Sequence, residues 1–118
     1  MEHVEISDLI ETASRLSERG KGILAADEST GTIGKRLLAV GLDNTQETRR
    51  AFREVLFTAP DIGKYLGGVI CFEETLVQTA KDGTKFTELL RMQGVLPGVK
   101  VDRGLRPLPG SDGETYTE

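Results

Sequence analysis

The sequence predicts an α/β fold built on a parallel sheet. Segments with helical spacing of apolar residues alternate with short apolar runs, as in a sheet whose strands are joined by helices. These runs show no polar–apolar alternation, which is typical of strands buried on both faces. The 118 residues, 37% hydrophobic and 29% charged, fit one small globular domain.

The first part of the chain predicts a helix, a strand and a second helix. Apolar residues recur at helical spacing over residues 8–19, with Ser7 as the N-cap and Gly20 as the C-terminal cap. The apolar run at 23–26 predicts a buried strand. Residues 33–40 predict the second helix.

A third helix is predicted after the segment "DNTQE". This segment resembles a capping box, with Asn44 or Thr45 as the cap and Glu47 reaching back to it. Pro60 and Gly63 interrupt the helix. The expected inward-facing residues are Ala51, Phe52, Val55 and Leu56.

The later part of the chain predicts two more strands. "GGVICF" predicts a second buried strand over residues 67–72, and a short helix follows that ends before Gly94. "GVKVD" predicts a third strand over residues 98–102. The last stretch, residues 107–118, is rich in turn residues and has no apolar face of its own.

Composition excludes several kinds of function. The net charge is −4 without a basic run, which disfavours a nucleic-acid partner. His3, near the start of the chain, is the only histidine. The sequence therefore lacks the histidines for a His-based metal site or a Ser-His-Asp triad. No apolar run approaches the roughly 20 residues of a membrane span. Cys71 has no disulfide partner and is interpreted as core, and the acidic start is unlike a transit peptide, so we expect a cytoplasmic location.

Two acidic residues follow the first predicted strand. Parallel α/β sheets gather their chemistry at the carboxyl ends of the strands, where Asp27 and Glu28 lie. Neighbouring residues on a strand point to opposite faces, so one acid can face a pocket while the other pairs with a surface cation. The alternative is a turn-forming acid beside Ser29.

Lys35 and Arg36 are placed near the start of the second predicted helix. If Thr30 or Thr32 caps it, the helix dipole disfavours each cation by roughly 0.3–1 kcal/mol. A bound phosphate would reverse this balance, with the Ser29 and threonine hydroxyls as further donors. The alternative is a pair of solvated cations on a helix face.

Lys100 lies in the third predicted strand. A lysine on a covered strand needs an anion, an acidic partner or solvent. Asp102 lies on the same face two residues on, so an ion pair and an anion site both remain open. Glu73 and Glu74 are interpreted as a solvated strand end.

Five segments together resemble class I fructose-bisphosphate aldolase, in order and at suitable spacing over essentially the whole chain. They are "GKGILAADESTGTIGKRL", "NTQETRRAFREVLFT", "GGVICFEETLVQ", "LPGVKVDRGL" and "GSDGETYTE". The resemblance implies that residues 1–118 are the N-terminal part of one TIM (β/α)8 barrel domain. About three of its eight strands would be present, so the barrel would be incomplete.

The resemblance also implies an activity in glycolysis and gluconeogenesis. The family cleaves fructose 1,6-bisphosphate reversibly to dihydroxyacetone phosphate and glyceraldehyde 3-phosphate through a lysine Schiff base. It needs no metal or other cofactor. The sugar bisphosphate and the triose phosphates are then the expected partners, with no nucleic acid and no membrane. The full-length protein is expected to be a homotetramer.

Site residues follow from the matching positions. Asp27 matches the catalytic aspartate near the substrate C4 hydroxyl and the Schiff-base nitrogen. The positions that match phosphate-binding side chains are Ser29, Thr32, Arg36 and Lys100. Thr32 stands where many members have serine, and Arg103 replaces the lysine common in "VDKG".

No lysine in this sequence matches the motif of the Schiff-base lysine. We therefore expect residues 1–118 alone to be inactive and to fold poorly, because an open parallel sheet exposes strand edges and apolar faces. The alternative function is that of a non-catalytic remnant, which binds phosphorylated sugars or docks with full-length aldolase subunits.

Overall fold

A parallel sheet of three strands forms the centre of the computed structural model, which describes residues 4–118. The strands are β1 (Gly22–Ala26), β2 (Leu66–Cys71) and β3 (Leu96–Val99), in the order β1-β2-β3. The predicted parallel α/β arrangement is confirmed. His3 lies outside the described residues.

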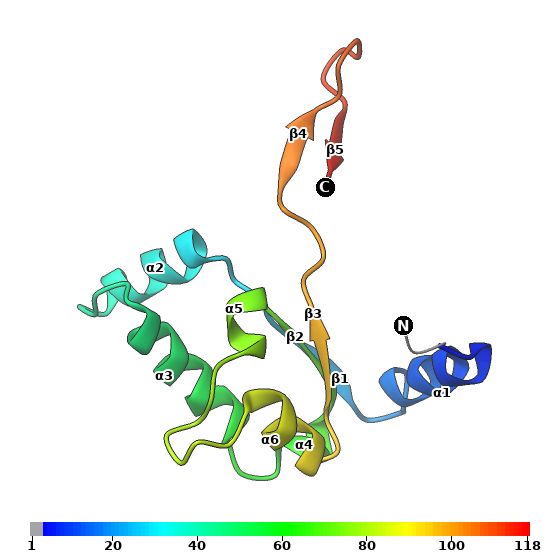
Figure 1. Cartoon of the computed structure of the whole chain (residues 1–118), viewed down its shortest axis with the longest axis vertical. Helices are drawn as coiled ribbons and strands as arrows, with labels where there is room; N and C mark the ends of the chain where they lie inside the picture. Colours follow the sequence, from blue (N-terminus) through cyan, green and yellow to red (C-terminus); the bar gives the residue numbers. More distant parts are fainter. Residues whose placement is uncertain (1–3) are drawn as a thin grey trace.

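Six helices precede or connect these strands in the described part of the chain (Figure 1). They are α1 (Ile6–Leu16) before β1, then α2 (Thr30–Ala39), α3 (Gln46–Phe57) and α4 (Ile62–Tyr65) before β2, then α5 (Glu73–Leu76) and α6 (Phe86–Met92) before β3. No helix within residues 4–118 is long and apolar enough to cross a membrane.

The hydrophobic core lies where α3 and α6 pack against the sheet. Phe57 of α3 and Phe86 of α6 are fully buried and meet edge to face, with ring centroids 5.3 Å apart. The other buried members are Ala26, Ile62, Val69, Cys71, Ala80, Leu90 and Val95. Cys71 is therefore a core residue, as predicted.

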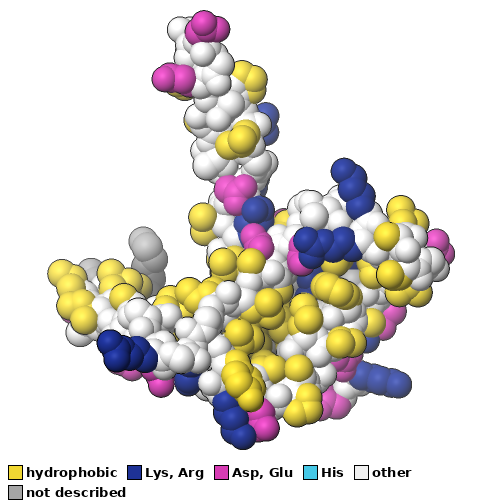
Figure 2. All heavy atoms as spheres, turned by 180° about the vertical axis from the view of Figure 1, so that it is seen from behind, with side chains coloured by type: hydrophobic (Ala, Val, Ile, Leu, Met, Phe, Trp, Pro, Cys, Tyr) yellow, Lys and Arg dark blue, Asp and Glu magenta, His cyan; other side chains and the backbone are white. Residues whose placement is uncertain are grey.

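Strand β1 differs from its prediction in burial. Only Ala26 at its carboxyl end is buried, whereas Ile23 is 51% exposed. In β3, Val99 is exposed as well. Figure 2 shows hydrophobic side chains gathered over the face of the molecule turned away from the view of Figure 1. Two of the three strands, β1 and β3, lie at the edges of the sheet. Their apolar runs, which predict burial on both faces, are therefore partly exposed.

Helix α1 has other caps than those predicted. It begins at Ile6 with Glu5 as its N-cap, and the Glu5 and Asp8 side chains form the capping box. Ser7 lies inside the helix. The helix ends before Ser17, and Gly20 lies in the turn before β1 with a φ of 83°.

The capping box of α3 is present but uses another residue. Thr45 is the N-cap, and its hydroxyl accepts from the backbone N–H of Thr48 at 3.1 Å. The Thr48 hydroxyl accepts in return from the Thr45 N–H at 2.9 Å. With the cap at position 45, Glu47 is only the second helical residue, one position short of the one that closes the box.

Three of the four residues predicted to face inward on α3 face α2 instead, namely Ala51, Phe52 and Val55. Leu56 packs against the core, as predicted. The buried residues of α3 are Arg53 and Phe57, while Val55 is 70% exposed. Between α2 and α3 lies an apolar groove of about 540 Å³. Its apolar lining is Ile33, Leu37, Val40, Leu42, Ala51, Phe52 and Val55.

The third strand and the segment after it also differ from the prediction. β3 ends at Val99, so Lys100 and Asp102 follow the strand. The Lys100 N–H still donates to the Cys71 carbonyl at 2.9 Å, which continues the pairing with β2. The turn-rich end of the chain forms an antiparallel hairpin, β4 (Leu105–Pro107) with β5 (Thr115–Thr117), that projects away from the sheet (Figure 1).

Candidate active site

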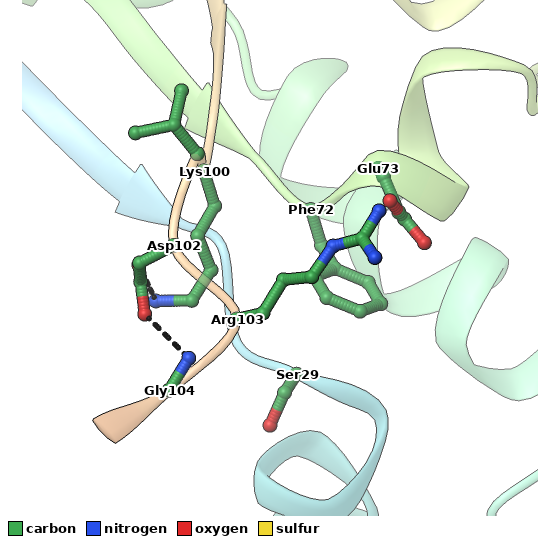
Figure 3. A pocket seen from close by; sticks show the side chains of 8 residues that line it. Ser29, Phe72, Glu73, Lys100, Asp102, Arg103 and Gly104 are labelled. Carbon is green, nitrogen blue, oxygen red and sulfur yellow. Dashed lines mark hydrogen bonds and ion pairs between the residues drawn. The ribbon is translucent and has the colours of Figure 1, made fainter. Parts of the chain in front are cut away.

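A cavity of about 760 Å³ lies at the carboxyl ends of the strands (Figure 3). Its lining comes from the segments that follow β1, β2 and β3, because parallel strands end at the same edge of a sheet. The lining side chains that carry polar or aromatic groups are Ser29, Phe72, Glu73, Lys100, Asp102 and Arg103. Three separate segments of the chain thus contribute to one cavity.

Lys100 lies between two carboxylates. Its Nζ is 2.9 Å from Oδ1 of Asp102 and 3.4 Å from Oδ2 of Asp27. The hydrogen bond to Asp102, and then that to Asp27, raise the pKa of Lys100 above its usual range. The same contact with Lys100, helped by the Gly104 N–H, lowers the pKa of Asp102. Lys100 is therefore a stable cation at neutral pH.

Asp27 and Glu28 point in different directions, as the strand alternation predicts. Asp27 contacts Lys100, which lines the cavity, but it is not itself one of the lining residues. Glu28 instead contacts two arginines: its Oε1 accepts from Arg36 at 2.8 Å, and its Oε2 is 3.5 Å from Arg53. The two acids serve separate partners and do not form a dyad.

Ser29, and neither Thr30 nor Thr32, is the N-cap of α2. Its hydroxyl makes no capping hydrogen bond and shares one of 3.1 Å with the Thr32 hydroxyl. Ser29 lines the cavity, whereas Thr32 adjoins it only through this contact.

The observed N-cap changes where Lys35 and Arg36 lie relative to the ends of α2. Because the helix starts at Thr30, Lys35 lies beyond its first turn and Arg36 lies in its last turn. The dipole penalty expected from the sequence is therefore absent, and at the C-terminal end the dipole favours a cation. Arg36 pairs with Glu28 and borders the apolar groove, and it does not line the cavity.

Glu73 and Glu74 do not form a solvated strand end. They open the helical turn α5, and only Glu73 is exposed. The guanidinium of Arg49 donates to both oxygens of Glu74, at 2.6 and 2.9 Å. This bidentate contact lowers the pKa of Glu74.

Sequence reasoning missed Arg53, and it named Arg103 only as a replacement for the lysine of the family and not as a residue of the cavity. Arg53 is fully buried, and its Nη2 donates to the Glu28 carbonyl at 2.7 Å. Its only sequence signal is its position four residues before Phe57, on the same helix face. Figure 3 shows Arg103 reaching toward Phe72 and Glu73, a placement that depends on the irregular chain after β3.

Metal-ligating groups do not gather at this site. Within residues 4–118, no cluster of three His, Cys, Asp or Glu side chains could hold a metal ion. Burial raises the pKa of the Cys71 thiol to about 11, so Cys71 is neither a thiolate ligand nor a nucleophile at neutral pH.

Parallel strands with helical connections and polar groups at their carboxyl ends define a class of α/β enzymes that hold their ligands at this edge. The comparisons with known proteins name the family within that class. Residues 8–118 match the family described as "Fructose-bisphosphate aldolase class-I". The chain belongs to this family.

Individual relatives agree with the family. The chain is 56% identical over 111 residues to the cytoplasmic isozyme of fructose-bisphosphate aldolase from Cicer arietinum, covering 94% of this chain and 31% of that protein. It is 50% identical over 109 residues to the chloroplastic fructose-bisphosphate aldolase 1 from Chlamydomonas reinhardtii, covering 92% of this chain and 29% of that one. The chain thus spans about a third of the length of these curated relatives.

A solved structure gives the same result for the fold. The chain resembles fructose-bisphosphate aldolase from Plasmodium falciparum, solved in complex with TRAP and a small molecule inhibitor. The TM-score is 0.89 and the sequence identity 46%, and the match covers 95% of this chain and 32% of that one.

Proposed function

We propose that this segment serves the reversible cleavage of fructose 1,6-bisphosphate to dihydroxyacetone phosphate and glyceraldehyde 3-phosphate. In this proposal residues 1–118 form the N-terminal part of a single (β/α)8 barrel domain. The observation that carries it is the contact of Asp27 with Lys100 across two strand ends, at 3.4 Å, in a chain of this family. These positions carry the acid and the phosphate-binding cation of the expected site.

Asp27 has the catalytic role in this proposal. Its carboxylate accepts a hydrogen bond from the C4 hydroxyl, whose deprotonation breaks the C3–C4 bond. The carboxylate also offsets the charge of the iminium that forms on the substrate ketone. Lys100, which follows β3, contacts the Asp27 side chain at the end of β1 and holds it in place.

Lys100 has a binding role and is not the imine-forming amine. The two carboxylates that hold it keep it protonated, and a protonated amine cannot attack a ketone. A cation at this position can bind a substrate phosphate instead. We expect the Schiff-base lysine to come from another part of the complete barrel.

Ser29, Thr32 and Arg36 complete the proposed phosphate site. The two hydroxyls share a hydrogen bond that each can exchange for one to a phosphate oxygen. The Arg36 side chain is 62% exposed, so its guanidinium can exchange Glu28 for a phosphate at modest cost.

The setting of the protein follows from the same family. We propose that it acts in the cytoplasm as a homotetramer, without metal or organic cofactor, and without a nucleic-acid or membrane partner. The net charge of −4 and the cytoplasmic isozyme among the relatives support this setting. A plastid location is the competing assignment, since another relative is chloroplastic.

A second candidate function is a non-catalytic remnant that binds sugar phosphates or docks with aldolase subunits. The observation that favours docking is the exposure of apolar side chains on the sheet, where Ile23 is 51% exposed. Residues 1–118 alone are expected to show no cleavage and no label after borohydride treatment with substrate.

A hybrid chain tests the proposed function. In the hybrid, residues 8–118 replace the corresponding segment of the Cicer arietinum isozyme, which is 56% identical over 111 residues. We expect the hybrid to cleave fructose 1,6-bisphosphate and to be labelled by borohydride in its presence. A folded hybrid without cleavage, beside an active parent enzyme, would contradict the proposal and favour the remnant.

A further inference from the structure

A fully buried arginine lies behind the carboxyl end of β1. Arg53 of α3 has no exposed surface and is the only buried lysine or arginine within residues 4–118. Burial lowers the pKa of the Arg53 guanidinium, because the nearby charge of Glu28 offsets only part of the lost solvation. A charge placed in the core costs several kcal/mol in solvation, so packing alone does not explain its presence.

The contacts of Arg53 are directed at one residue. Its Nη2 donates to the backbone carbonyl of Glu28 at 2.7 Å and lies 3.5 Å from Oε2 of the same residue. Within residues 4–118, Nε and Nη1 of Arg53 and Oε2 of Glu28 have no hydrogen-bond partner. Arg53 therefore contacts the backbone of Glu28 through a hydrogen bond and its side chain through an ion pair.

Glu28 lies between two residues of the candidate site. Asp27 precedes it and contacts Lys100, and Ser29 follows it and lines the cavity. Its other carboxylate oxygen accepts from Arg36 at 2.8 Å. A displacement of the Glu28 backbone would therefore move the side chains on both sides of it.

We propose that Arg53 is a positioning residue, which fixes the segment 27–29 through Glu28 and thereby sets the placement of Asp27 and Ser29 toward the substrate. The kinetic part of this inference rests on the proposed aldol cleavage. The structural part concerns the order of segment 27–29 and does not depend on the activity.

The test uses the hybrid chain with Arg53→Met, which keeps an unbranched apolar stem and removes the charge and the donors. Arg50→Met is the matched control, because Arg50 lies on the same helix and pairs with Glu47 and Glu54. Arg53→Lys keeps the charge and a hydrogen-bond donor group but loses the planar guanidinium.

Two readouts separate positioning from general stability. We expect Arg53→Met to increase hydrogen exchange of the backbone amides of residues 27–31 and to lower kcat/KM by about 10²-fold, since small misplacements cost that much. Arg53→Lys should recover part of both effects, and Arg50→Met should show neither. In a double-mutant cycle with Glu28→Gln, the loss in kcat/KM should be clearly less than the product of the single losses.

Several results would overturn the inference. One is an Arg53→Met hybrid with a lower thermal midpoint but unchanged exchange at 27–31 and kcat/KM within twofold. Another is an additive cycle with Glu28→Gln. If Arg53→Met does not fold, Glu28→Gln decides alone, and unchanged exchange at 27–31 in that variant contradicts the inference. An unmodified hybrid without cleavage refutes the proposed function, while the exchange readout still decides on Arg53.

Discussion

Lys100 owes its charge to the strand ends that surround it. Lys100 follows β3 and forms ion pairs with Asp102 in its own segment and with Asp27 at the end of β1. These two carboxylates raise its pKa, so the amine stays protonated. A lysine in this setting can hold an anionic substrate, while a nucleophilic lysine needs a lowered pKa.

The first prediction concerns the binding role of Lys100. In the hybrid chain, Lys100→Met should raise KM for fructose 1,6-bisphosphate by about 10- to 100-fold, as expected for a lost charge-assisted hydrogen bond of roughly 1.5–3 kcal/mol. Steady-state cleavage assays measure this. Lys64→Met is the control, because Lys64 is exposed on α4. An unchanged KM for Lys100→Met would contradict the binding role.

For single residues, the sequence predicts which side chains pair or point apart better than it predicts the surroundings of one side chain. The opposite directions of Asp27 and Glu28 and the pairing of Lys100 with Asp102 follow from spacing along the chain. The environment of Arg36 could not be predicted, because one change of cap residue moves it from the first turn to the last turn of α2.

Helix α3 connects several other elements through its arginines. Arg49 holds Glu74 at the start of α5, and Arg53 holds Glu28 after β1. The sequence predicts the helix and its capping segment from local patterns. It does not predict which face is buried, because the buried face carries an arginine and the apolar stripe faces α2.

The second prediction concerns the ion pair of Arg49 with Glu74. The pKa of Glu74 is lowered in the folded state, so its stabilising effect is present above the unfolded pKa of about 4.3. It is lost as the pH falls through the folded pKa. Arg49→Met should therefore destabilise the hybrid by about 1–3 kcal/mol at pH 7 and by less below about pH 4.

Thermal unfolding of the hybrid and of Arg49→Met at both pH values measures this difference. Arg91→Met is the matched control, because Arg91 is exposed on α6 and has no ion pair within residues 4–118. A loss of stability that is equally large at both pH values would contradict the assigned role of this pair.

The molecule as a whole has one covered and one uncovered side. The core lies between the sheet and helices α3 and α6, whereas Ile23 and Val99 remain exposed. The order and direction of the strands could be predicted from the alternation of elements. The uncovered apolar face agrees with the open sheet that the resemblance implies. The projecting hairpin could not be predicted, because residues 107–118 carry turn residues without an apolar face of their own.

The third prediction uses Cys71, the single cysteine of the sequence, as a probe of folding. In the hybrid it should resist a thiol reagent at pH 8, because it is 1% exposed and burial raises its pKa to about 11. In residues 1–118 alone it should react about as fast as in urea, because we expect the uncovered sheet to fold poorly. Mass spectrometry of the Cys71 peptide measures both rates, and equal protection in the two chains would contradict this expectation.

The most direct measurement is cleavage of fructose 1,6-bisphosphate by the hybrid chain with Asp27→Asn. Asp61→Asn is its control, because Asp61 is exposed and its left-handed conformation, with a φ of 61°, suits asparagine. We expect Asp27→Asn to fold, to bind substrate and to lose at least about 10²-fold in kcat, since the carboxylate that accepts the hydrogen bond of the C4 hydroxyl and offsets the iminium charge is gone. An Asp27→Asn hybrid that cleaves the sugar as fast as the unmodified hybrid would contradict the proposed site.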